Sequence, residues 1–112
     1  MSWTLRGGLA APLLFIAAVA LAQGGGNPTA GRSKATRCQT CHGLDGIAVV
    51  PDAPHIAGQP APYLSAQLRA YRAGARKNDQ MSLVVEGLSD ADIADLAAWY
   101  ASIEISAKVP AR

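Results

Sequence analysis

The sequence predicts an all-α domain, and three observations support this fold class. Apolar residues near the C-terminus recur at helical spacing and so form one face of a helix. They are Ile93, Leu96, Ala97, Tyr100 and Ile103. No segment shows a sustained alternation of apolar and polar residues, which is the pattern of a half-buried strand. Loops rich in glycine and proline separate the remaining apolar segments.

Four helices are expected along the chain. The last begins at Ser89, because Ser89 and Asp92 resemble a capping box with aspartate in place of the usual glutamate. The others are predicted over residues 30–41, 62–74 and 82–86, the second of them starting at a proline and ending at a glycine. Residues 42–61 form a long irregular loop, and such loops are usually functional or disordered.

The N-terminal segment predicts export from the cytoplasm. Residues 1–22 have the layout of a secretory signal peptide, in which Arg6 precedes an apolar run that ends in the small residues of Ala20-Leu21-Ala22. Pro12 interrupts the run, whereas a transmembrane helix usually needs about 20 apolar residues. An uncleaved membrane anchor is the alternative. Residues 23–29 are then a flexible leader, residues 30–112 are one domain, and the periplasm is the expected compartment.

Charge gives little information about partners. Without Arg6, nine Lys/Arg face eight Asp/Glu, so the exported chain is nearly neutral and offers no electrostatic argument for binding nucleic acid. One locally basic segment contains Arg69, Arg72, Arg76 and Lys77. It is either a docking surface for an acidic partner or a solvated helix face.

The stretch Cys38-Gln39-Thr40-Cys41-His42 contains the only two cysteines of the chain. A zinc site with His55 as fourth ligand has unsuitable spacing, because zinc fingers separate their histidines by three to five residues. A redox dithiol lacks its usual βαβ context, and a plain disulfide leaves His42 unexplained. Cys-x-x-Cys-His is the attachment signature of c-type haem. The sequence therefore predicts one haem c, bound covalently through Cys38 and Cys41, with His42 as an axial ligand of the iron.

Met81 is the candidate for the second axial ligand. It is the only methionine after Met1, and it follows the polar run Lys77-Asn78-Asp79-Gln80, where an apolar core residue would be out of place. A thioether is the usual partner of histidine in electron-carrying haem proteins. The alternatives are that Met81 fills the core and that His55 binds the iron instead.

The chain resembles a class I c-type cytochrome of the small, single-haem bacterial kind, similar to cytochromes c4 and c-553. The resemblance rests on residues 38–43, 54–59, 63–68, 74–76, Met81 and 87–98. It implies three to five helices wrapped around one covalently attached haem. It also implies that the Pro54 carbonyl accepts a hydrogen bond from His42, that Ile56 packs on the haem, and that Gly31 lets the first helix cross closely over Trp99 or Tyr100. Cytochromes c4 carry two haems in tandem, whereas this chain has one haem motif.

These ligands predict an electron carrier and no enzyme. With both axial positions of the iron filled, substrates cannot reach the metal, and only electrons pass. The expected partners are a redox protein donor and acceptor, with membrane-bound respiratory complexes among the candidates, and neither nucleic acid nor a small-molecule substrate. Two alternatives stay open. One is a haem subunit or membrane-tethered module of a larger respiratory dehydrogenase or oxidase, and the other is a five-coordinate haem peroxidase if Met81 is not a ligand.

Overall fold

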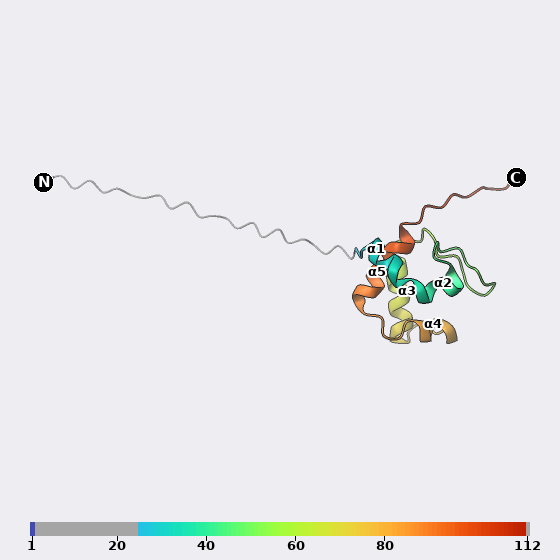
Figure 1. Ribbon diagram of the computed structural model, residues 1–112, viewed down its shortest axis with the longest axis horizontal. Helices are drawn as coiled ribbons and strands as arrows, with labels where there is room; N and C mark the ends of the chain where they lie inside the picture. The colour runs from blue at the N-terminus through green and yellow to red at the C-terminus, as the bar shows by residue number, and fades with distance from the viewer. Residues whose placement is uncertain (2–24, 112) are drawn as a thin grey trace.

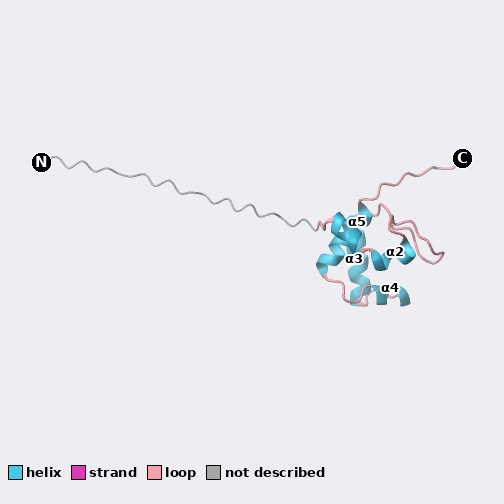
Figure 2. Ribbon diagram, in the orientation of Figure 1, coloured by secondary structure: helices cyan, strands magenta, loops and turns pink. Residues whose placement is uncertain are grey.

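The computed structural model describes Met1 and residues 25–111. Within that part of the chain the fold is all-helical, as predicted, and contains no strand (Figures 1 and 2). Its helices are α1 (Pro28–Lys34), α2 (Thr36–His42), α3 (Ala61–Ala73), α4 (Asp79–Val84) and α5 (Asp90–Ala101). The loop between α2 and α3 extends away from the helices, and so does the segment that follows α5 (Figure 1).

α1 crosses closely over α5. Gly31 is buried at this crossing, and a Cβ atom built on it would lie 1.9 Å from the Asp95 carbonyl oxygen and 2.8 Å from the Trp99 Cβ. The close approach over Trp99 that the resemblance implied is therefore confirmed. Lys34 adds ion pairs across the same contact, at 2.9 Å from Asp92 and 2.7 Å from Asp95. Its ammonium group lowers the pKa of both carboxyls, that of Asp92 to about 2.

The prediction of one helix over residues 30–41 was wrong, because the helix is interrupted at Ala35. The Ala35 backbone has φ −73° and ψ 4°. Its N–H donates to the carbonyl of Arg32, three residues earlier, whereas an α-helix uses the carbonyl four residues earlier. The Ala35 side chain is fully buried in the core. Tertiary packing explains the break: α1 follows the crossing with α5, while α2 turns to bring Cys38 against the core.

The hydrophobic core lies where α3 and α5 pack together beneath this turn. Its buried cluster consists of Ala35, Leu64, Leu96, Ala97 and Tyr100. The capping box at Ser89 is present with both of its hydrogen bonds, and the predicted apolar face of α5 is buried up to Tyr100. The second predicted helix is also confirmed. α3 ends at Ala73 and is capped by Gly74, whose φ of 75° is left-handed backbone that glycine adopts without strain.

The helix predicted over residues 82–86 begins earlier, at Asp79, so Met81 lies within α4 and not in the preceding loop. Asn78 explains the earlier start. Its side-chain oxygen accepts hydrogen bonds from the backbone N–H groups of Gln80 and Met81, at 3.1 and 2.9 Å, which caps the first turn.

The last residues of the predicted leader belong to the folded domain. Pro28 and Thr29 form the first turn of α1, and the Asn27 backbone N–H donates to Asp95 at 2.7 Å. The predicted signal peptide, residues 1–22, lies outside the described residues apart from Met1. No helix within residues 25–111 is long and apolar enough to cross a membrane.

Candidate haem site

The haem-attachment motif occupies the last five residues of α2. Cys38 and Cys41 are free, partly exposed thiols. Residues three apart lie on the same side of a helix, so the two sulfur atoms can reach one ligand together. Cys38 also packs against the core cluster, and this burial raises the pKa of its thiol to about 11.

His42 ends α2 and is buried, with 9% of its surface exposed. Its Nδ1 atom lies 2.8 Å from the Pro54 carbonyl oxygen. A carbonyl oxygen only accepts hydrogen bonds, so Nδ1 is the donor and carries the ring proton. The lone pair of the neutral imidazole is then on Nε2, which is the arrangement found in a histidine that binds a metal through that nitrogen. The contact with Pro54 that the resemblance implied is present.

The loop that carries Pro54 is fixed by its own backbone. The N–H groups of Ile56 and Ala57 both donate to the Gly46 carbonyl, at 2.8 and 3.1 Å. At the start of the loop, the Val49 N–H donates to the Cys41 carbonyl at 2.9 Å, which ties the loop to the end of α2. These bonds hold the Pro54 carbonyl at a defined position beneath the imidazole.

Two aromatic side chains of α5 attach the same loop to the helical core. The Tyr100 hydroxyl donates to the Gly43 carbonyl at 3.0 Å, and the Trp99 Nε1–H donates to the Leu44 carbonyl at 2.8 Å. Burial raises the pKa of Tyr100, so its hydroxyl stays protonated as a donor. Both aromatics lie on the predicted last helix, but their contacts could not be predicted from the sequence, because they join residues more than 50 positions apart.

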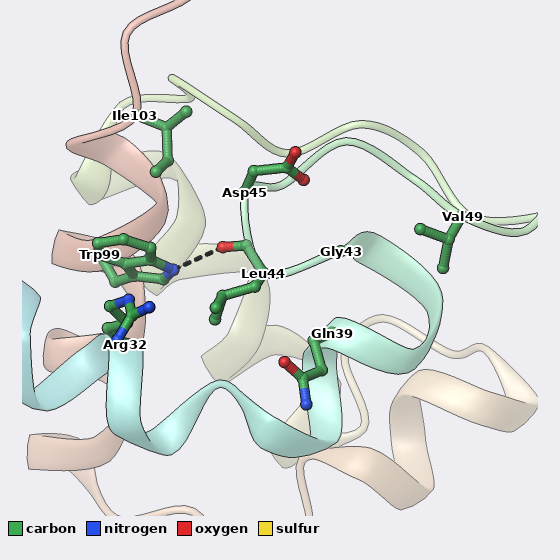
Figure 3. Close-up of a pocket in the computed structure, with 8 residues that line it drawn as sticks. All are labelled: Arg32, Gln39, Gly43, Leu44, Asp45, Val49, Trp99 and Ile103. Carbon is green, nitrogen blue, oxygen red and sulfur yellow. Dashed lines mark hydrogen bonds between the residues drawn. The ribbon is translucent and has the colours of Figure 1, made fainter.

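A depression of about 500 Å³ lies beside this attachment, and Figure 3 shows the residues that line it. Its lining residues are Arg32, Gln39, Gly43, Leu44, Asp45, Val49, Trp99 and Ile103. The Arg32 guanidinium lies 5.8 Å from the centre of the Trp99 ring, within range of a cation–π interaction. None of the predicted haem ligands lines the depression, so it is distinct from the candidate haem site.

The remaining predicted site residues come from different elements. Ile56 is partly buried and packs against the core cluster that also contacts Cys38. Met81 is partly buried in α4, a helix that packs against α3. His55 is exposed, and its Nδ1 accepts a hydrogen bond from the Ala48 backbone N–H at 2.8 Å.

The hydrogen bond to Ala48 argues against His55 as the sixth ligand. It occupies Nδ1 as an acceptor, so the proton of the neutral ring is on Nε2 and neither nitrogen offers a free lone pair. The bond closes the tip of the loop instead. This structural role was not predicted from the sequence, since it depends on how the loop folds back on itself.

We therefore expect His55→Ala to leave iron coordination unchanged and to weaken the loop. The free energy of unfolding should fall by about 1 kcal/mol, the usual contribution of one hydrogen bond. Urea unfolding followed by haem absorbance measures this loss. His55→Asn, which keeps an acceptor oxygen, is the matched control and should recover part of the stability. Carbon monoxide binding by reduced His55→Ala would show instead that His55 holds the sixth position.

The donor set fits haem c. Two thiols on one side of α2 precede a buried imidazole whose Nδ1 proton is held by a carbonyl, leaving Nε2 to bind iron. The fold suits a cofactor as well. Only three large side chains among the described residues are fully buried, namely Ile93, Leu96 and Val85. A domain with so small a core often needs an additional stabilising element, and a bound cofactor is one.

An all-α fold with Cys-x-x-Cys-His at the end of a helix and a carbonyl-bound histidine defines a c-type cytochrome. Comparison with known families agrees. The model of the cytochrome c family matches residues 29–104, and the chain belongs to this family. Its cofactor is therefore haem c, bound covalently.

Individual relatives point the same way. Cytochrome c-554(548) of Halomonas halodenitrificans is 45% identical over 82 residues, which cover 70% of this chain and 99% of the relative. Cytochrome c4 of Pseudomonas aeruginosa is 39% identical over 94 residues, which cover 84% of this chain and 47% of the relative. The structure of reduced recombinant cytochrome c4 from Pseudomonas stutzeri matches with a TM-score of 0.67 and 36% identity, over 70% of this chain and 46% of the other. The chain thus spans almost all of the first relative and about half of the cytochromes c4.

Proposed function

We propose that this protein is an exported carrier of single electrons whose haem iron is held between His42 and Met81. The observation that carries the proposal is the attachment motif at the end of α2, with the His42 imidazole fixed on the Pro54 carbonyl at 2.8 Å. The haem supplies an iron ion that exchanges one electron at a time. With His42 and Met81 both bound to the iron, no position would be left for a substrate, so the protein would act as a carrier and not as an enzyme.

The residues of α2 hold and orient the cofactor. Cys38 and Cys41 form thioether bonds that keep the cofactor bound in both charge states. His42 would bind the iron through Nε2, while its Nδ1 proton is held by the Pro54 carbonyl, and this hydrogen bond fixes the plane of the ring and increases the basicity of Nε2. Because the loop beneath the ring is tied to α5, the imidazole changes position little when the charge of the iron changes.

Met81 would supply a thioether as the second protein ligand of the iron. A thioether favours the reduced state and so raises the reduction potential relative to ligation by water. Its place in a capped helix orients the side chain better than a free loop would. Ile56 packs against the same core cluster as Cys38, and it would cover the cofactor and limit access of water.

The proposed localisation follows from export, and the proposed partners follow from the redox chemistry of the haem. Residues 1–22 act as a signal peptide that delivers the domain to the periplasm, where a redox protein donates the electron and another accepts it. The basic segment over residues 69–77, which spans the end of α3 and the turn after it, is a weaker docking surface than its sequence suggests. Arg72 pairs with Asp90 at 2.6 Å, while Arg76 donates to Gln67 at 2.7 Å and lies 4.7 Å from the centre of the Tyr71 ring.

The proposal predicts a covalent haem that undergoes a reversible one-electron reaction. After expression of the full chain in a host that matures c-type cytochromes, acid–acetone extraction should leave the colour on the polypeptide. A potentiometric titration should follow a one-electron curve, and the reduced native protein should not bind carbon monoxide. Cys38→Ala, which retains one thioether bond, is the control and should shift the absorption maxima without releasing the haem. Extractable haem would refute covalent attachment, and rapid carbon monoxide binding would indicate a five-coordinate iron and favour the peroxidase alternative.

A further inference from the structure

The helix that carries Met81 depends on tertiary anchors to keep its place. α4 contains only six residues, and none of them is buried. A helix of one to two turns has little stability of its own, because its nucleation cost is recovered only through packing or through longer helical runs. Within the described part of the chain, α4 packs mainly against α3. The contacts that hold its end therefore decide how firmly Met81 is positioned.

One such contact comes from the haem-attachment helix. The Arg37 guanidinium, through Nη1, donates to the Val84 carbonyl at 3.0 Å and to the Glu86 carbonyl at 3.2 Å. Val84 is the last residue of α4, and the final carbonyls of a helix have no partner within the helix. A cation at this end also interacts favourably with the helix dipole. Arg37 therefore acts as a C-terminal cap contributed by a different helix.

We propose that Arg37 is a positioning residue for the axial methionine. It directly precedes Cys38 on α2, so its side chain connects the helix that carries both cysteines and His42 with the end of the helix that carries Met81. The bridged residues are 47 and 49 positions apart in the sequence. This inference rests on the proposed ligation by Met81 and adds to it the contact that keeps that ligand in place.

Val85 supplies the apolar half of the same anchor. It directly follows α4, is fully buried, and donates its N–H to the Met81 carbonyl at 3.1 Å. The two carbonyls that Arg37 binds flank this residue, so the guanidinium fixes the backbone on both sides of the buried side chain. Loss of the guanidinium would let this segment open more often, and each opening would withdraw Met81 from the iron.

The test uses the holoprotein and the variant Arg37→Met, which keeps an unbranched side chain of similar length but removes the donors. We expect the reduced variant to bind carbon monoxide roughly tenfold faster, since two hydrogen bonds from a charged donor no longer oppose opening. The sulfur–iron absorption band of the oxidised protein should weaken. The Val85 amide, whose partner is the Met81 carbonyl, should exchange with solvent faster by a similar factor.

Two further variants make the result specific. Arg37→Lys keeps a charged donor and should recover part of the native behaviour. Arg69→Met removes an equivalent charge from an exposed arginine of α3 that lies 4.0 Å from Asp90, and it should leave carbon monoxide binding unchanged. Amide exchange of Leu96 in the core of α5 serves as the reference for global stability.

Each outcome supports or overturns the inference. Faster carbon monoxide binding supports a positioning role if amide exchange is faster at Val85 and unchanged at Leu96. If Arg37→Met behaves like Arg69→Met, or if Leu96 exchange accelerates by the same factor as Val85, the positioning role is wrong while the proposed function stands. If Met81→Ala itself leaves the reduced protein inert to carbon monoxide, the assignment of Met81 fails, and the inference fails with it.

Discussion

Gly31→Ala will destabilise the domain strongly, although alanine is the better helix former. In an exposed helix this substitution is favourable by about 1 kcal/mol. Here the added Cβ would lie 1.9 Å from the Asp95 carbonyl oxygen, and the backbone of α5 cannot yield without moving the helix. α1 and α5 must therefore separate, and such overpacking should cost roughly 3 kcal/mol or more in the free energy of unfolding.

Urea unfolding of the holoprotein, followed by far-ultraviolet circular dichroism and by haem absorbance, measures this cost. Gly74→Ala is the matched control. A Cβ at position 74 would meet no atom within 4 Å, but the backbone there has a φ of 75°. The free energy of unfolding should therefore fall by only about 1 kcal/mol, from backbone strain. A Gly31→Ala protein as stable as wild type would show that the two helices cross less closely than the structure places them.

Features encoded in a few neighbouring residues could be predicted from the sequence. The attachment motif at Cys38–His42 is contiguous, and the capping box at Ser89 and Asp92 depends on positions three apart, so both follow from local chemistry alone. The contact between His42 and Pro54 spans twelve positions and came from the family resemblance, not from the residues themselves.

Features produced by packing could not be predicted. The break at Ala35 has no glycine or proline to mark it and results from burial of that side chain between helices. The start of α4 was missed because Asn78 is an N-cap within a polar run that also reads as a loop. The bridge from Arg37 to the end of α4 joins segments 47 positions apart, and no local pattern identifies its partner.

Met81→Ala should convert the electron carrier into a haem protein with an accessible iron. The substitution leaves the Asn78 cap and the Arg37 contact of α4 in place, and alanine is the strongest helix former, so α4 should persist without the thioether. His42 and both thioether bonds are unaffected by the substitution, which leaves the cofactor attached to α2. The vacated sixth position then takes water or an external ligand.

The reduction potential should fall by something on the order of 200 mV, a fraction of the roughly 0.8 V over which axial ligands tune haem proteins. The sulfur–iron absorption band should disappear, the reduced protein should bind carbon monoxide rapidly, and weak peroxide turnover should appear. Optical spectra, potentiometric titration and stopped-flow mixing with carbon monoxide measure these changes.

Leu83→Ala is the matched control for the methionine variant. Leu83 lies on the same helix, is 67% exposed, and undergoes a similar loss of apolar side chain, but it is not a candidate ligand. Its spectrum, potential and inertness to carbon monoxide should match those of the native protein. An unchanged band and potential in Met81→Ala would defeat the assignment, because a thioether that binds iron cannot be removed without a change in its absorption. The sixth ligand would then have to come from another side chain. His55 would have to give up its hydrogen bond from Ala48 to bind the iron, and a protein with both Met81→Ala and His55→Ala would show whether it does.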